Sequence, residues 1–248
     1  MREEVDTPPF GSLRRHYSRT DSTNTRAREL AAAGAPNGTV VTTDEQTEGR
    51  GRQGRAWTAP AGKALLYSAV VRPLDPGDAL LPLAVPLAVC AAAEELQPGI
   101  ECAVKWPNDV QVDGRKLAGV LIEARPQDGW AVIGVGLNLA ISRDEFPPEL
   151  RETATSLFPG SDCTLSPAGL QTAAADALNR RLEHWLGANQ QEVLAAWRER
   201  DALRGREIAW EGGSGVADGV DDRGYLLVVV PSGERIALGA GEIHLTRI

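Results

Sequence analysis

Apolar residues recur along the chain in runs of four to ten residues, separated by Gly, Pro and Asp, which is typical of strands. These runs predict strands at 38–43, 63–71, 102–106, 109–112, 115–123 and 130–139. The last run is apolar almost throughout and is interrupted by Gly134 and Gly136. Because a strand of that kind is buried on both faces, we expect helices to cover this sheet.

Helical patterns lie between and after these strands. An alanine-rich segment, 25–33, follows the N-cap cluster Asp21-Ser22-Thr23-Asn24 and ends at Gly34. The cluster has two interpretations: helix capping alone, or hydroxyls and an amide that bind a polar ligand at a helix N-terminus. A buried helix is predicted from a turn at 75–78 to residue 95, with a kink at Pro86. Two more helices are predicted on either side of Gly187.

The C-terminal part of the chain has a different sequence pattern. From about residue 203 it consists of short predicted strands, 208–210, 215–220, 225–230 and 234–238, joined by Asp/Gly- and Pro/Gly-containing turns. Several short strands in fewer than fifty residues predict a small β-barrel. We therefore expect a main domain, 1–201, and a small C-terminal domain, 202–248.

Composition narrows the class of protein. The chain has 248 residues, 42% of them hydrophobic, with a net charge of −8 and a pI near 5.0. An acidic chain is a poor general nucleic-acid binder, because that affinity comes from neutralising phosphates. Cys90, Cys102 and Cys163 form no CxxC pair, and neither a signal peptide nor a membrane-spanning run is visible. These features predict a cytoplasmic protein with no DNA or membrane partner.

The stretch 49–57, Gly-Arg-Gly-Arg-Gln-Gly-Arg-Ala-Trp, predicts a cationic loop that approaches an anion closely. It formally matches the GxGxxG dinucleotide fingerprint, but five polar residues separate it from the preceding strand, and Pro60 follows where a helix should run. An Arg-Gly segment of an RNA-binding protein is a second alternative, which the acidic chain does not favour.

Two lysine-containing segments flank a predicted hairpin. Asp113-Gly114 is a two-residue turn signal, so 105–109 (Lys-Trp-Pro-Asn-Asp) and 116–119 (Lys-Leu-Ala-Gly) lie on antiparallel strands and can face one site. The alternative is that Lys105 and Lys116 are solvated edge charges. His16, His184 and His244 are widely separated and suggest neither a catalytic triad nor a metal pair, so we expect catalysis by positioning and charge stabilisation.

Taken together in order, these motifs resemble those of the biotin–protein ligases, also called biotin–[acetyl-CoA-carboxylase] ligases. The resemblance rests on 21–24, Gln46, 49–57, 105–109, 116–119 and Gly134-Val135-Gly136-Leu137-Asn138, and it covers about half the chain. It implies an α+β fold: a mixed β-sheet flanked by helices, as in a class II synthetase-like catalytic domain, with a small C-terminal SH3-like β-barrel.

The resemblance also implies an activity and a set of site residues. Such enzymes use ATP to convert biotin to biotinyl-5′-AMP and then transfer biotin to a lysine of a biotin carboxyl carrier protein domain. Lys116, Arg52 and Asp109 are the implied catalytic residues, with Mg²⁺ accompanying ATP. The implied biotin and adenylate contacts are Ser22, Thr23, Asn24, Gln46, Gly49, Arg50, Gly51, Arg52, Trp57, Lys116, Gly119 and Asn138.

Two departures from the family pattern stand out. The family loop often carries basic residues where this chain has Gln53 and Ala56. Only about twenty residues precede Ser22, too few for the DNA-binding domain of bifunctional members, so we expect a monofunctional ligase. A monomer and a weak, ligand-linked homodimer both fit the sequence. A lipoate or octanoate ligase or transferase of the same superfamily is the nearest alternative.

Overall fold

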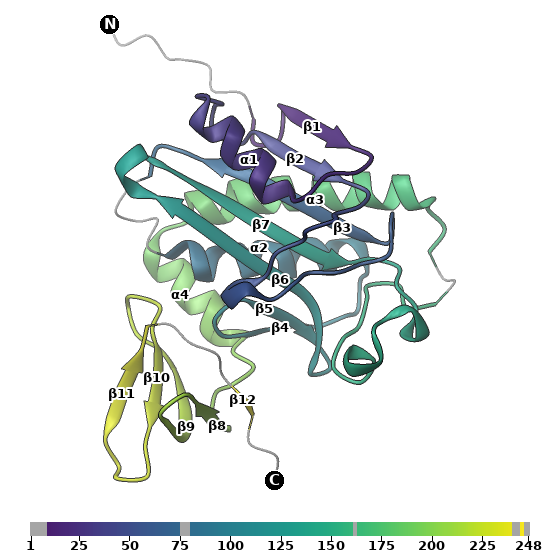
Figure 1. The fold of residues 1–248 in the computed structure, drawn as a ribbon. Helices are drawn as coiled ribbons and strands as arrows, with labels where there is room; N and C mark the ends of the chain where they lie inside the picture. The colour runs from purple at the N-terminus through teal and green to yellow at the C-terminus, as the bar shows by residue number, and fades with distance from the viewer. Residues whose placement is uncertain (1–8, 75–79, 161–162, 240–243, 246–248) are drawn as a thin grey trace, which may run out of the picture.

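A computed structural model describes residues 9–74, 80–160, 163–239 and 244–245, and it contains two β-sheets (Figure 1). The larger sheet has seven strands in the order β1-β2-β3-β7-β6-β5-β4. The strands are β1 Arg14–Tyr17, β2 Val40–Thr43, β3 Ala64–Val71, β4 Cys102–Lys105, β5 Asp109–Val112, β6 Arg115–Arg125 and β7 Trp130–Asn138. β1 and β2 are parallel, and the other neighbouring pairs are antiparallel, which confirms the predicted mixed sheet.

Alternate residues of the central strands face two different layers. On one face, Tyr67 and Ile133 belong to the large hydrophobic core formed with α2 (Leu81–Leu96), α3 (Pro167–Gly187) and α4 (Gln190–Glu199). On the other face, Val70 and Val132 pack against α1 (Thr23–Ala32). β3 is buried along its whole length, as a strand covered on both faces must be.

In the described residues, apolar clusters cover the two ends of the α1 side of the sheet. α1 covers one end, and Ala64 and Leu66 at the other end pack against Phe146 and Ala154. The loop that carries Phe146 and Ala154 includes the short 3-10 helices η4 (Arg143–Glu145) and η5 (Pro148–Leu150). Between the two covered ends the sheet presents Ser68, paired with Gly134, and Gly136, the next residue of β7 on this face. Small residues therefore leave a hollow over the middle of the sheet.

The observed elements differ from the predicted ones in a few places. α1 begins at Thr23, two residues before the predicted start, and α2 continues through Pro86. β1, Arg-Arg-His-Tyr, was not predicted because it is a mostly exposed edge strand without an apolar pattern. The predicted turn at 75–78 lies outside the described residues. The short 3-10 helix η3 (Pro126–Asp128) connects β6 to β7.

The second sheet is built from the C-terminal residues, where the sequence pattern predicted several short strands. It contains β8 (Glu207–Trp210), β9 (Gly213–Val220), β10 (Leu226–Val229), β11 (Arg235–Leu238) and β12 (His244–Leu245) in the order β11-β10-β9-β8-β12. Its neighbouring strands are antiparallel, and it lies beside α4, which contacts β9 (Figure 1). No helix in the described part of the chain is long and apolar enough to cross a membrane.

Candidate active site

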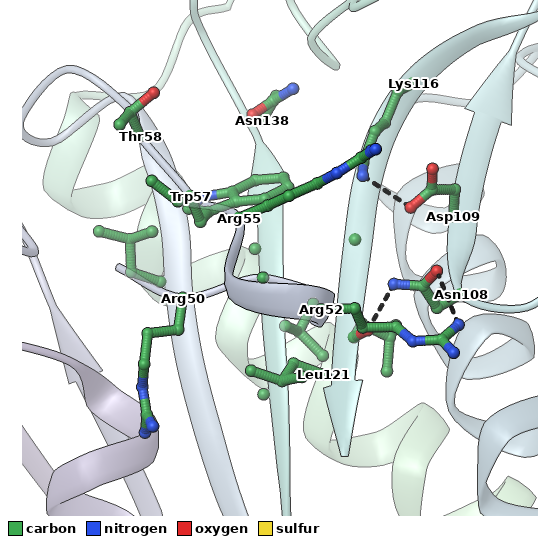
Figure 2. A pocket seen from close by; sticks show the side chains of 18 of the residues that line it. Arg50, Arg52, Arg55, Trp57, Thr58, Asn108, Asp109, Lys116, Leu121 and Asn138 are labelled. Carbon is green, nitrogen blue, oxygen red and sulfur yellow. Dashed lines mark hydrogen bonds and ion pairs between the residues drawn. The ribbon is translucent and has the colours of Figure 1, made fainter. Parts of the chain in front are cut away.

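The hollow over the middle of the sheet is a cavity of about 320 Å³. Its walls come from the N-terminus of α1, the loop 50–58, the segment 105–109, β6 and the loop 146–154. Figure 2 shows side chains of the loop 50–58, of Asn108 and Asp109, and of β6 around it. Eleven predicted site residues line this single cavity: Ser22, Thr23, Asn24, Gln46, Arg50, Gly51, Arg52, Trp57, Lys116, Gly119 and Asn138. The third predicted catalytic residue, Asp109, lines it as well, whereas Gly49 lines an adjoining groove.

The N-terminus of α1 points polar groups at the cavity instead of using them for capping. Ser22 occupies the N-cap position with extended backbone, but its hydroxyl accepts no hydrogen bond from the helix. Gln46 takes over the capping role, since its Oε1 accepts from Thr23 N at 2.8 Å and from Thr23 Oγ1 at 3.0 Å. The first turn carries no acidic residue, so the positive end of the helix dipole stays available to a ligand. The Ser22 hydroxyl is therefore not used for capping, as the ligand-binding interpretation of the cluster requires.

The start of α1 is held by Asp21. Its Oδ1 accepts from Ser22 N at 2.7 Å, and its Oδ2 pairs with Arg26 at 2.8 Å. Burial alone would raise the pKa of Asp21, but the hydrogen bonds from Arg26, Ser22 and Thr20 outweigh it and lower that pKa to about 2. Asp21 is thus a charged anchor for Ser22 at neutral pH.

A polar network runs beneath the cavity from β3 to β6. Ser68 is fully buried; its Oγ donates to Asn24 Oδ1 at 2.6 Å and lies 2.8 Å from Thr23 Oγ1. Asn24 Nδ2 donates to Glu123 Oε2 at 2.8 Å. Buried polar groups that satisfy one another in this way fix their side-chain orientations. Neither Ser68 nor Glu123 was predicted from the sequence, since neither lies in a motif that the sequence analysis used.

The glycine–arginine loop is a closed hairpin. Trp57 N donates to Gly49 O at 2.9 Å and Gly51 N donates to Arg55 O at 2.7 Å, while η1 (Arg52–Gly54) forms the tip. Two of the three loop arginines that line the cavity, Arg50 and Arg52, diverge. Arg50 extends away from Lys116 (Figure 2) and pairs with Glu123 at 3.4 Å, whereas Arg52 Nη1 lies 3.5 Å from Asn108 Oδ1. Arg50 therefore ties the base of the loop to the sheet, and Arg52 presents its charge at the tip.

Trp57 lies across the cavity, and two glycines on neighbouring strands make room for it. A Cβ on Gly136 would sit 2.3 Å from Trp57 Cε2, and one on Gly119 would sit 3.0 Å from Trp57 Cζ3. Trp57 Nε1 is buried and has no acceptor among the described residues. Since buried donors are nearly always paired, this N–H is suited to a ligand acceptor.

Lys116 and Asp109 meet across the β5–β6 hairpin, as predicted. Asp113 and Gly114 form the turn with φ of 51° and 72°, and Lys116 Nζ lies 2.6 Å from Asp109 Oδ1 (Figure 2). The Lys116 ammonium also sits 5.6 Å from the centroid of the Trp57 ring, a cation–π distance. The alternative of a solvated edge charge is therefore wrong for Lys116. Lys105 lines the same cavity.

Arg52 is a partly buried cation near this pair. Burial lowers the pKa of Arg52, and the negative charge of Asp109 offsets part of that effect. Arginine stays protonated despite such a shift, so the lost hydration is a free-energy cost that an anionic ligand would relieve. The cavity thus has a polar end at α1 and a cationic end between Lys116 and Arg52.

One wall of the cavity was not predicted. Residues 146–154 close it beside β6, where Lys116 N donates to Thr153 O at 2.7 Å and Thr155 N donates to Lys116 O at 2.9 Å. Asn138 Nδ2 donates to Thr155 O at 2.9 Å. The side-chain amide of Asn138, which was predicted as a ligand contact, therefore also holds this wall in place. The only sequence signal for this wall is a pair of apolar residues, Phe146 and Leu150, in a Pro- and Glu-rich stretch.

Comparisons with known proteins agree with this geometry. The model of the biotin/lipoate A/B protein ligase family matches residues 17–139. The biotin–[acetyl-CoA-carboxylase] ligase of Mycobacterium tuberculosis is 36% identical over 241 residues, which are 92% of this chain and 87% of that protein. The ligase of the same name from Paracoccus denitrificans is 32% identical, over 88% of this chain and 95% of that protein.

A solved structure shows the same fold. The biotin protein ligase from Aquifex aeolicus, in complex with biotin and ATP, superimposes with a TM-score of 0.78 and 27% identity, covering 96% of this chain and all of that one. The similarity extends through both sheets, since nearly the whole chain is covered. The ordered motifs, their convergence on one cavity and these relatives lead to one conclusion: the chain belongs to the biotin protein ligase family.

Proposed function

We propose that the protein is an ATP-dependent biotin–[biotin carboxyl carrier protein] ligase. In the first half-reaction the biotin carboxylate attacks the α-phosphate of ATP, which gives biotinyl-5′-AMP and pyrophosphate. In the second, a lysine amine of a carrier-protein domain attacks the mixed anhydride and releases AMP. The observation that carries this proposal is the meeting of Lys116, Asp109 and Arg52 in the cavity that the α1 N-terminus also lines.

The polar end of the cavity suits the ureido ring of biotin. The Ser22 hydroxyl is not used for capping, and Gln46 Oε1 is occupied by Thr23, so the Gln46 amide N–H₂ group remains to bind a carbonyl oxygen. Asn24 is held by Ser68 and Glu123 and shapes this end of the cavity. We assign Ser22, Thr23 and Gln46 to the biotin head, with Asn24 as their support.

The cationic end suits the reacting groups. A carboxylate that attacks a phosphate brings two anions together, and fixed positive charges lower the free energy of that approach. Lys116 would lie at the carboxylate and α-phosphate, and Arg52, with Gly51 and the backbone of the loop, would cover the adenylate. Trp57 Nε1, Gly119 and Asn138 are proposed contacts on the adenine side. Asp109 would orient or deprotonate the acceptor amine once Lys116 is engaged by phosphate.

We further propose that Mg²⁺ enters with ATP, held by phosphate oxygens and water. Within the described ranges no three His, Cys, Asp or Glu side chains are grouped to bind a metal ion. The expected division at 201/202, with an SH3-like barrel in the C-terminal part, is also a proposal, supported by the five-stranded second sheet.

The test is pyrophosphate release by the purified protein with ATP and either biotin, lipoate or octanoate. We expect release with biotin and little with the other two acids. The matching family model includes lipoate ligases, so the comparison is needed. Release with lipoate alone would overturn the biotin assignment.

A further inference from the structure

The turn between β9 and β10 touches the rim of the active-site cavity. Trp106, which follows Lys105 in the cavity wall, is buried with 4% of its surface exposed. Its indole Nε1 donates to Gly224 O at 3.1 Å, across more than a hundred residues of sequence. This hydrogen bond joins the second sheet directly to the segment that carries Asp109.

The turn between β9 and β10 is closed by hydrogen bonds to one of its own side chains. Asp221 Oδ1 accepts hydrogen bonds from Arg223 N and Tyr225 N, both at 2.9 Å, which closes the turn on its own side chain. Gly224 has a φ of +80°, a conformation that favours glycine, and a Cβ there would lie 3.2 Å from Leu83 Cδ1 of α2. The carbonyl that accepts from Trp106 therefore has a fixed position.

Helix α4 fixes the same turn from another side. Arg198 Nη2 donates to Val220 O at 3.2 Å, and Gln190 Nε2 donates to Asp222 O at 2.8 Å. The turn is thus held by α4 and by its own side chain, and its Gly224 lies close to Leu83 of α2.

The residues that follow Trp106 contact Arg52 and Lys116, the two cations assigned to the reaction. Asn108 Nδ2 donates to Val120 O at 2.9 Å, and Asn108 Oδ1 faces Arg52 at 3.5 Å. The next residue, Asp109, pairs with Lys116 at 2.6 Å. A shift of Trp106 would therefore move the partners of both catalytic cations.

We propose that Trp106 is a positioning residue through which the C-terminal sheet holds the segment 105–109 in its reactive geometry. The inference rests on the proposed function, because the reaction that is positioned is adenylate formation. The second sheet then contributes to the first half-reaction through one indole N–H.

The test is Trp106→Phe, which keeps an aromatic ring and removes the N–H. We expect kcat for biotin-dependent pyrophosphate release to fall about tenfold, with the KM for biotin within about twofold of wild type, since small misplacements of reacting groups lower rates steeply. Trp197→Phe is the matched control, because Trp197 is fully buried and its Nε1 has no acceptor among the described residues. It should leave kcat within about twofold.

A second variant acts on the other side of the contact. Asp221→Ala opens the turn outside the cavity and should lower kcat to a similar extent. The double variant should be no slower than the slower single variant, because both changes break one connection. Should Trp106→Phe be too unstable to assay, a loss of kcat in Asp221→Ala supports the inference and an unchanged kcat overturns it.

Three results would overturn the proposal: wild-type kcat in Trp106→Phe, an equal loss in Trp197→Phe, or multiplied losses in the double variant. Failure of the proposed function gives a different result, since wild-type protein would then release no pyrophosphate with biotin.

Discussion

Replacing Lys116 by alanine tests the charge balance of the cavity. Lys116 Nζ lies 2.6 Å from Asp109 Oδ1, and both side chains are partly buried, with 36% and 23% exposed. In the proposed reaction Lys116 faces two anions, the carboxylate and the α-phosphate. Lys116→Ala removes that attraction and also leaves the Asp109 carboxylate beside them without its ion-pair partner.

The expected loss of rate in Lys116→Ala follows from these two effects. Removing one preorganised group that stabilises a developing charge costs about 2.7–4 kcal/mol, or roughly 100- to 1000-fold in rate. An unpaired carboxylate about 4 Å from another charge adds repulsion that is at most about 4 kcal/mol at an effective dielectric of 20, and solvent screens it at this partly exposed site. We therefore expect Lys116→Ala to slow adenylate formation about 1000-fold or more. Removing the Asp109 carboxylate as well should raise the rate of adenylate formation again by about tenfold, which corresponds to roughly 1.4 kcal/mol of activation free energy.

The assay is single-turnover formation of biotinyl-5′-AMP. This step does not involve the acceptor amine, so the proposed role of Asp109 toward that amine cannot affect the measured rate. Lys63→Ala is the matched control: Lys63 is similarly exposed and pairs with Glu145, outside the cavity. It should leave the rate within about twofold. Near-normal adenylate formation by Lys116→Ala would refute the assignment. A double variant as slow as the single one would refute the repulsion by Asp109.

Three further predictions concern the loop, the network beneath it and the start of α1. Arg52→Gly removes the cation at the loop tip and should let biotinyl-5′-AMP escape, seen as biotin on bystander lysines; retention equal to wild type would count against a covering role. Glu123→Gln removes the charge that holds Arg28 and Arg50 and should weaken biotin binding about three- to tenfold by calorimetry, whereas the exposed Glu29→Gln should not. Because the pKa of folded Asp21 is lowered from 3.8 to about 2, its stabilisation is present above pH 3.8 and is lost as pH falls through about 2. Asp21→Asn should lower the free energy of unfolding at pH 7 and flatten its fall over that acid range, and an unchanged profile would contradict the anchor.

Most of the sheet could be predicted because its strands are apolar and its turns carry strong signals. The β5–β6 hairpin is the clearest case: the Asp113-Gly114 turn predicts that the segments of Lys116 and Asp109 face one site, and the two side chains form an ion pair there. β1 could not be predicted, because an edge strand with one exposed face needs no apolar period. Its parallel pairing with β2 depends on the tertiary fold, which a local pattern does not encode.

The site was predicted as a list of residues, but not as an arrangement. Motifs indicated that Arg50 and Arg52 both belong to the loop, yet only the fold shows that Arg50 binds Glu123 while Arg52 faces Asn108. The wall at 146–154 was missed because it is irregular and is held by backbone hydrogen bonds to Lys116, which leave no sequence signature. The same holds for the Trp106–Gly224 contact, which joins residues far apart in the chain.

Transfer to a carrier domain tests the central claim most directly. A biotin carboxyl carrier protein domain is incubated with the protein, ATP and biotin, and its mass is measured intact and after proteolysis. We predict the gain of one biotinyl group on a single lysine, dependent on both ATP and biotin and absent with Lys116→Ala. An unchanged mass, or modification only when lipoate replaces biotin, would contradict the account.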